Sequence, residues 1–394
     1  ELGQITAMWW SPDSKKVAFY RFEEKEAEMY YVLYNQVKIQ DSVEIEAYPK
    51  VGANNLPVDI MVYDLETKQT TLIDARNDQP FNDGNLGTYL YGMNWTPDGK
   101  EFLFHSTNRK QDIMEYRASD PVTGKTRTVV REEWLSSFTK NTPEMHVLED
   151  GQHFIWASER SGFNNYYLYN FDGTLVNAIT SHNFEVNRIL KVDEKNKTLY
   201  YEARSGENHM KMQLHRVELN GKNDNQLTDA GFHHSVTISP DGKYFIDVAQ
   251  THDKAPVANL VNAKGKKIAE IAKSDTSKFD ALGLKNVEVF TFTSADGVTE
   301  LHGMLHFPSN FDPNKKYPTL LYCQGGPQSA VSQFWSYRWN FQMMAANGYI
   351  IVAPNRRGLP TFGREWNDQI SGDWGGQAQK DYLSAIDQAV EEPY

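Results

Sequence analysis

One hairpin motif decides the fold of this 394-residue chain, and its clearest copy is Ile238-Ser239-Pro240-Asp241-Gly242-Lys243-Tyr244-Phe245-Ile246. Proline presets the backbone of such a turn, aspartate caps it, and glycine supplies a positive φ. The aromatic and β-branched residues on either side favour strands. Other copies of the turn, some of them weaker, begin at Ser11, Thr96, Glu149 and Asp193.

The spacing of these turns predicts the architecture. Successive turns are 85, 53, 44 and 46 residues apart, and a four-stranded propeller blade takes about 40 to 50 residues. Three of the steps match one blade each, and the first holds either a degenerate blade or a long insertion. A two-sheet sandwich is not expected to repeat its hairpins at this step over so long a span. We therefore predict an all-β propeller, present in part, over residues 1–280.

The region from residue 23 to residue 50 has a pattern of its own. An acidic run from Glu23 to Glu28 precedes the apolar stretch Met29–Tyr34, and apolar and charged residues alternate from Val43 onward. Alternation of this kind predicts strands, so we expect an extended hairpin that stands off its blade. Taken alone, the acidic run is typical of a solvated loop.

The pattern changes after Leu282, and residues 285–394 form the second predicted domain. Strands that are apolar on both faces belong in a parallel sheet covered by helices, and two such runs occur here. The predicted elements are, in order, a hairpin over 287–307, strands over 319–323 and 348–353, and helices over 334–346 and 377–391. This order is typical of an α/β-hydrolase, so we predict an incomplete α/β-hydrolase parallel sheet after the propeller.

The candidate catalytic loop is Gln324-Gly325-Gly326-Pro327, which follows directly on an apolar strand. An α/β-hydrolase places its oxyanion-hole loop at this point, because glycine lets backbone N–H groups reach the tetrahedral oxygen. An ordinary tight turn is the alternative. We name Gln324, Gly325 and Gly326 as the candidate oxyanion-hole residues.

A second loop, Asn355–Gly376, is rich in arginine, glycine and aromatic residues and follows the next parallel strand. Loops at the carboxyl ends of parallel strands border the active sites of such sheets. The alternative is that Arg364 and Asp373 only hold the loop together through an ion pair.

Composition and missing motifs exclude several functions. The formal charge of −12 argues against a nucleic-acid partner, and no run approaches the ~18 apolar residues of a membrane span. The 11 histidines show no metal-ligand spacing, since His233 and His234 are adjacent and diverge on a strand. We therefore predict no metal site and no cofactor. No Gly-x-Ser-x-Gly nucleophile elbow occurs anywhere in the chain.

Several blocks of sequence carry a family resemblance. Met8–Pro12, Tyr48–Pro57 and Ser158–Tyr169 resemble the propeller of dipeptidyl peptidase IV-type serine peptidases, and Lys316–Pro327 is similar to the opening of the prolyl-oligopeptidase-type hydrolase domain. The resemblance implies a serine exopeptidase that releases dipeptides from free peptide amino termini by acyl transfer. It also implies a fragment, holding the second half of the propeller and the start of the hydrolase domain. The catalytic Ser, Asp and His are expected beyond Tyr394, so the fragment itself is expected to be inactive.

The resemblance also suggests site residues. In this family an acidic pair before the Trp-Trp-Ser-Pro block holds the substrate's amino terminus, and Glu1 lies in that neighbourhood. The family's type enzyme completes its oxyanion hole with a tyrosine hydroxyl, and the matching position here is Gln324. This difference favours a broader specificity than strict cleavage after proline. An acylaminoacyl peptidase, a prolyl oligopeptidase and a non-catalytic scaffold are the alternatives.

The resemblance implies two partners. One is a peptide substrate, and the other is a second copy of the chain, because the 23–50 hairpin matches the propeller arm through which family members dimerise. By analogy with the family, a periplasmic or secreted location is expected.

Overall fold

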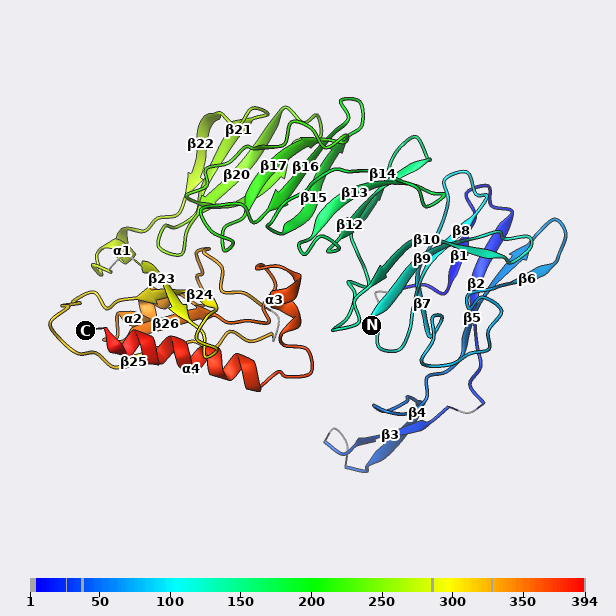
Figure 1. Cartoon of the computed structure of the whole chain (residues 1–394), viewed down its shortest axis with the longest axis horizontal. Coiled ribbons are helices and arrows are strands. Elements are labelled where there is room, and N and C mark those ends of the chain that lie inside the picture. Colours follow the sequence, from blue (N-terminus) through cyan, green and yellow to red (C-terminus); the bar gives the residue numbers. More distant parts are fainter. Residues whose placement is uncertain (1–4, 26, 37–38, 285–286, 327–328, 393–394) are drawn as a thin grey trace. The chain divides into compact units, whose positions relative to one another are not determined.

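The computed structural model describes residues 5–25, 27–36, 39–284, 287–326 and 329–392 (Figure 1). The chain divides into two compact units. Unit 1 comprises Glu1–Trp156 and Tyr169–Val176, and unit 2 comprises Ala157–Leu168 and Asn177–Tyr394. The domain limits expected from the sequence, near residues 280–285, stay a prediction.

Five sheets of four strands account for most of the chain, as a series of propeller blades requires. The first has the order β1-β2-β5-β6 and contains Met8–Trp10, Lys16–Phe22, Val58–Asp64 and Thr70–Ile73. The second has the order β10-β9-β8-β7, where β7 to β10 are Tyr89–Trp95, Phe102–Thr107, Ile113–Ser119 and Thr126–Glu133.

The other three sheets follow chain order. Strands β11 to β14 are Met145–Val147, His153–Ser158, Asn165–Asn170 and Leu175–Ala178. Strands β15 to β18 are Val186–Asp193, Thr198–Ala203, Gln213–Glu218 and Asn225–Gln226. Strands β19 to β22 are His233–Ile238, Tyr244–Gln250, Val257–Asn262 and Lys267–Lys273.

The repeated turn joins the first two strands in each of these five sheets, and in each case these strands are antiparallel. In the fifth sheet, the Ser239 hydroxyl donates to Asp241 at 2.7 Å, and the same carboxylate accepts the Lys243 N–H at 3.1 Å. Gly242 adopts a φ of +70° between them. The motif therefore specifies the hairpin through local hydrogen bonds, and its prediction is confirmed.

The long first step contains an insertion and no further blade. Strand β2 pairs directly with β5, and β3 (Met29–Tyr34) and β4 (Ser42–Ala47) form a separate two-stranded sheet between them in the chain. Figure 1 shows this hairpin standing off the sheet, as expected. Of the two alternatives for residues 11–96, the insertion is correct.

The carboxy-terminal sheet has the order β23-β24-β26-β25, with β25 and β26 parallel. Its strands are Val287–Thr293, Glu300–His306, Thr319–Leu321 and, for β26, Ile350–Asn355. The helices are α1 (Ser277–Asp280), α2 (Phe341–Ala345), α3 (Arg364–Asp368) and α4 (Gly376–Glu391). On one face Leu305 and Val352 pack against Ala385 of α4, and on the other Met304 and Ala353 pack against Phe341 of α2. The predicted sheet with helices on both faces is confirmed.

The crossover helix is shorter than the sequence predicts. Only Phe341–Ala345 is helical, because the Asn340 side chain caps it by accepting the Met343 N–H at 3.0 Å. The preceding Trp335 is buried instead against Phe279, and its backbone N–H donates to Gln250 Oε1 at 3.1 Å. Contacts with distant segments thus replace the first half of the predicted helix. Among the described residues, none of the helices has the length and apolar composition that a membrane span requires.

Candidate active site

The loop after β25 carries Gln324, and two tyrosines fix its conformation. The buried Tyr382 on α4 donates its hydroxyl to the Gln324 carbonyl oxygen at 3.1 Å. The Tyr322 hydroxyl donates to Gln324 Oε1 at 3.0 Å. Because Tyr322 occupies the side-chain oxygen, the amide nitrogen Nε2 is left as a donor, with only a long contact of 3.4 Å to the Gly325 carbonyl. Gln324 therefore holds an N–H donor in the loop where an oxyanion-hole donor is expected.

The two glycines of the loop are exposed. Gly326 has a φ of +138°, a backbone conformation that only glycine adopts at low cost. At Gly325, no described atom lies within 4 Å of the place where a side chain would begin. Packing within the described chain does not require a glycine there, so the open space is consistent with the approach of a substrate. Pro327 lies outside the described residues.

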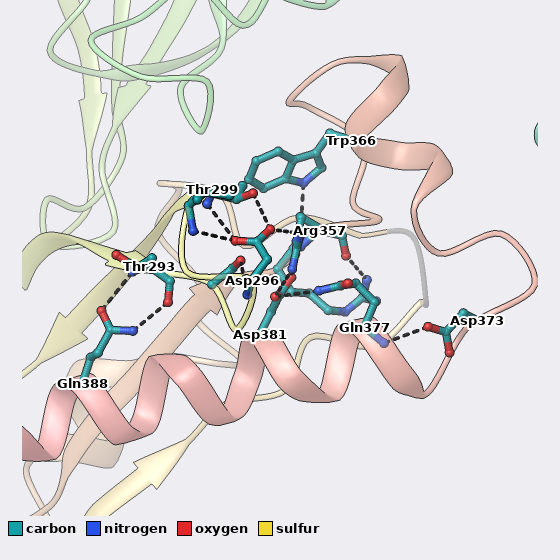
Figure 2. Close-up of polar contacts among 12 residues, drawn as sticks. Thr293, Asp296, Thr299, Arg357, Trp366, Asp373, Gln377, Asp381 and Gln388 are labelled. Carbon is teal, nitrogen blue, oxygen red and sulfur yellow. Dashed lines mark hydrogen bonds and ion pairs between the residues drawn. The ribbon is translucent and has the colours of Figure 1, made fainter.

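An ionic network joins the segment after β26, helix α4 and the β23–β24 turn, and it is buried at Arg357 and Asp381 but exposed at Asp296 (Figure 2). Arg357 donates to Asp381 from its backbone N–H and Nε, both at 3.0 Å, and from Nη2 at 2.8 Å. Asp381 has no exposed surface, and Gln377 donates to it at 3.0 Å. Arg357 also pairs with Asp296 in the turn. Every oxygen of Asp381 is thus occupied, as a buried carboxylate requires.

Hydrogen bonds within the network keep Arg357 and Asp296 charged. Hydrogen bonds that Arg357 donates to Asp381 raise the pKa of Arg357, and hydrogen bonds with Ser294 and Thr299 hold the pKa of Asp296 far below its ordinary value. Gln388, near the carboxyl end of α4, exchanges two hydrogen bonds with the backbone of Thr293 (Figure 2). The helix that carries Tyr382 is therefore held at two points along its length.

The second candidate loop, Asn355–Gly376, does not contain the Arg364–Asp373 ion pair that was the alternative interpretation of its sequence. Arg364 is buried and pairs with Glu159 at 2.8 Å and with Asp368 at 3.0 Å. Asp373 instead accepts the backbone N–H groups of Gly376 and Gln377 at the start of α4. The alternative of an Arg364–Asp373 pair is thus wrong, because the buried Arg364 binds the partly buried Glu159 and Asp368, while Asp373 caps a helix.

A cavity of about 280 Å³ lies beside Gln324. Its lining includes Tyr322, Phe341 and two histidines, His252 and His306, whose ring nitrogens have no hydrogen-bond partner in the described structure. Burial lowers the pKa of His252 to about 4, and burial lowers the pKa of His306 as well. Both imidazoles are therefore neutral at pH 7, and each offers one N–H donor and one nitrogen acceptor.

Two further predictions concern residues outside this region. Glu1, expected to bind the substrate's amino terminus, lies outside the described residues. No metal site was expected, yet the structure brings His182, His215 and Asp224 together, with potential ligand atoms within 4.8 Å of one another. The sequence hides this cluster because its members come from three separate segments. Of the adjacent histidines, His234 is buried and binds Asp247 at 2.7 Å.

Comparisons with known proteins agree with this architecture. Residues 1–256 match the family described as the dipeptidyl peptidase IV (DPP IV) N-terminal region, and residues 335–394 match the prolyl oligopeptidase family. The chain resembles a solved structure of Porphyromonas gingivalis dipeptidyl peptidase 4 with a TM-score of 0.79. That match covers 100% of this chain and 55% of the other at 21% identity, and it shows the fold alone. The predicted propeller followed by the start of an α/β domain is confirmed.

Two curated relatives are similar in sequence. The chain is 31% identical to dipeptidyl-peptidase 5 of Porphyromonas gingivalis over 322 residues, which cover 77% of this chain and 44% of the relative. It is 52% identical to dipeptidyl-peptidase 5 of Porphyromonas endodontalis over 124 residues, which cover 32% of this chain and 18% of the relative. The chain thus spans less than half the length of these curated relatives.

Proposed function

This chain belongs to the dipeptidyl peptidase IV-type branch of the prolyl oligopeptidase family, and on that premise we propose that the whole protein is a serine peptidase that removes dipeptides from free peptide amino termini. The observation that carries the proposal is the family match over residues 1–256, together with relatives that are named dipeptidyl-peptidases. The substrate is a peptide with an unblocked amino terminus.

The proposed reaction is acyl transfer. A serine attacks the peptide carbonyl, a histidine moves the proton, and hydrogen-bond donors stabilise the oxyanion that forms. The 394 residues contain no Gly-x-Ser-x-Gly motif for this serine. The contribution of this chain is the loop after β25, where Gln324 Nε2 and the backbone N–H of Gly325 serve as donors. The Tyr322 and Tyr382 hydroxyls support this role because they hold the loop in place before the substrate binds.

Recognition of the amino terminus is proposed for Glu1. A carboxylate binds an ammonium group through charge-assisted hydrogen bonds, which would explain selectivity for unblocked peptides. The replacement of the type enzyme's tyrosine by Gln324 supports cleavage after residues other than proline, because the oxyanion donor is then an amide.

We also propose that the whole protein dimerises through the β3–β4 hairpin. Cross-strand pairing places Tyr31 opposite Ile45 and Leu33 opposite Val43 on one face of this hairpin. These four side chains are between 54% and 65% exposed. A contiguous apolar face of this kind on a projecting hairpin is typical of an interaction surface, and a second copy of the same hairpin has the matching apolar face.

The test uses the whole protein with a dipeptidyl nitroanilide, with and without an acetyl group on its amino terminus. We expect turnover of the free substrate only. Preference for the acetylated substrate would favour an acylaminoacyl peptidase and overturn the proposal. The 394-residue chain alone is expected to give no turnover.

Gln324→Ala tests the role of the loop. Loss of one oxyanion donor is expected to lower kcat by about 100-fold with little change in KM. Gln379→Ala, an exposed glutamine on α4, is the matched control and is expected to leave both constants unchanged. An unchanged kcat in Gln324→Ala would contradict the assignment of this residue.

A further inference from the structure

Two histidines and one aspartate converge at the β15–β18 sheet, which lies in unit 2. His182 lies between β14 and β15, His215 on β17, and Asp224 just before β18. His182 Nε2 is 2.9 Å from Asp224 Oδ2, and His215 Nδ1 is 3.0 Å from Asp224 Oδ1. Nitrogen and oxygen ligands of a zinc ion lie about 2.0–2.2 Å from the metal, which places neighbouring ligand atoms about 3 Å apart. Each histidine nitrogen lies at this spacing from a different oxygen of Asp224, and one ligand atom from each of the three residues lies within 4.8 Å of the others, so the side chains would draw closer together around one ion.

The three side chains are partly or fully shielded from water. The exposed fractions of the side chains are 7% for His215, 19% for His182 and 21% for Asp224. The His182 ring stacks on Phe184 with centroids 4.2 Å apart. The buried Asn165 fixes the His182 backbone by accepting its N–H at 3.0 Å and donating to its carbonyl at 3.1 Å. Low exposure and fixed rotamers favour metal binding because the side chains lose little conformational entropy when the ion binds.

Two of the three ligands, His215 and Asp224, also have an outer partner of the kind that metal sites use. His215 Nε2 lies 2.6 Å from the Ser205 hydroxyl, which lies 3.2 Å from Gln226 Oε1. With a metal on Nδ1, His215 would donate its Nε2–H to Ser205, and Ser205 would donate to Gln226. The Tyr201 hydroxyl donates to Asp224 Oδ2 at 2.6 Å. Such outer hydrogen bonds orient metal ligands and set their tautomers.

The electrostatics of the cluster suit a cation. In the described part of the chain, the salt-bridge partners of Asp224 are the two histidines, and no lysine or arginine pairs with it. The carboxylate therefore has no permanent cation beside it among the described residues.

The chain of contacts from Ser205 through His215 to Asp224 has the connectivity of a serine-hydrolase triad. Two observations favour a metal site over a nucleophile. Gln226 competes for the proton of Ser205, and a second histidine, His182, binds the same carboxylate. A catalytic serine needs neither, whereas both fit a metal ligand set with an outer shell.

We infer that His182, His215 and Asp224 bind one zinc ion, which cross-links the segment before β15, strand β17 and the turn before β18. Imidazole nitrogen and carboxylate oxygen are ligands that zinc accepts, and a fourth position is left for water. The ion would stabilise this blade. The inference is independent of the peptidase reaction.

The experiment uses the untagged chain in a Cys323→Ser background, because Cys323 is exposed and free. After treatment with a chelator, the chain is titrated with Co²⁺ alone, whose visible absorption reports the coordination geometry. We expect one Co²⁺ per chain, displacement by Zn²⁺, and a melting temperature that rises with the Zn²⁺ concentration. His182→Ala and His215→Ala are expected to abolish the Co²⁺ spectrum.

Ser205→Ala keeps all three ligands and is expected to weaken binding by about tenfold, as loss of an outer partner does. The matched control is His153→Ala, which removes a partly exposed histidine whose ion-pair partner in the described chain is Asp150, and it is expected to bind Co²⁺ like wild type. Circular dichroism verifies folding of each variant. No Co²⁺ spectrum in the wild type, or an equal spectrum in His182→Ala and His215→Ala, would overturn the inference and leave the cluster as a hydrogen-bond network.

Discussion

Arg357 and Asp381 form a complete buried ion pair, in which one carboxylate accepts the Arg357 backbone N–H and two of its guanidinium N–H groups. Arg357 is the second residue after β26, and Asp381 immediately precedes Tyr382 on α4. The pair therefore positions the tyrosine that holds the backbone of Gln324. Its role is to support the candidate catalytic loop.

Asp381→Asn is expected to destabilise the carboxy-terminal sheet by about 3–5 kcal/mol, because it leaves the buried Arg357 charge without its main partner. The free energy of unfolding is measured by chemical denaturation and followed by tryptophan fluorescence. Glu66→Ala breaks an ion pair with Lys15 in which both side chains are more than half exposed, and it should produce no resolvable change. An equal loss in the two variants would show that burial of the pair is unimportant.

Stability is expected to fall as the pH is lowered from about 6.5 to about 4, because of His252 and His306. An unfolded histidine has a pKa of about 6.5, and burial lowers the pKa of His252 to about 4. Between these values the unfolded chain binds more protons, so acid favours unfolding. Asp253 opposes the shift and Lys211 and Lys254 add to it.

His252 is expected to contribute up to about 3 kcal/mol to this loss of stability, and His306 acts in the same direction. Denaturation midpoints at several pH values measure it in wild type and in His252→Asn. The variant should show a weaker pH dependence. Phe341→Leu changes packing in the same cavity without removing a titratable group and should keep the wild-type slope. A slope unaffected by His252→Asn would refute the assignment.

Gly303→Ala is expected to destabilise the same sheet by about 1–3 kcal/mol through overpacking. A β-carbon at this position on β24 would meet the Phe290 ring at 2.6 Å and the Pro354 Cα at 2.9 Å. Gly325→Ala is the matched control, since nothing described lies within 4 Å of its β-carbon. Thermal unfolding compares the two. An unchanged melting temperature in Gly303→Ala would contradict the packing argument.

The double variant Tyr31→Lys with Ile45→Glu is expected to convert the whole protein from dimer to monomer. These residues are directly opposite each other, so an opposite-charge pair preserves the hairpin while removing its apolar face. Tyr30→Lys places a similar pair with Glu46 on the other face and should remain dimeric. Light scattering measures the mass of each. A monomeric wild type, or a dimeric double variant, would rule out this interface.

The sequence by itself determined the features that rest on contacts between near neighbours. The repeated turn is closed by hydrogen bonds within five residues, as between Ser239 and Asp241, so five hairpins and their spacing could be predicted from the chain. The alternation in residues 43–48 and the continuous apolar runs likewise predicted the β3–β4 hairpin and the parallel pair. Gln324 could be selected because it directly follows the apolar run Thr319–Cys323.

Only the tertiary structure decided which distant side chains meet. Arg364 binds Glu159, 205 residues away, so a pairing chosen by proximity in the chain, with Asp373, was wrong. The crossover helix is short because Trp335 packs against Phe279, which local helix propensity does not reveal. The same holds for Tyr382 on Gln324 and for His182, His215 and Asp224. Side chains that converge from separate segments leave no spacing for sequence analysis to read, because their contacts exist only once the sheets and α4 have packed.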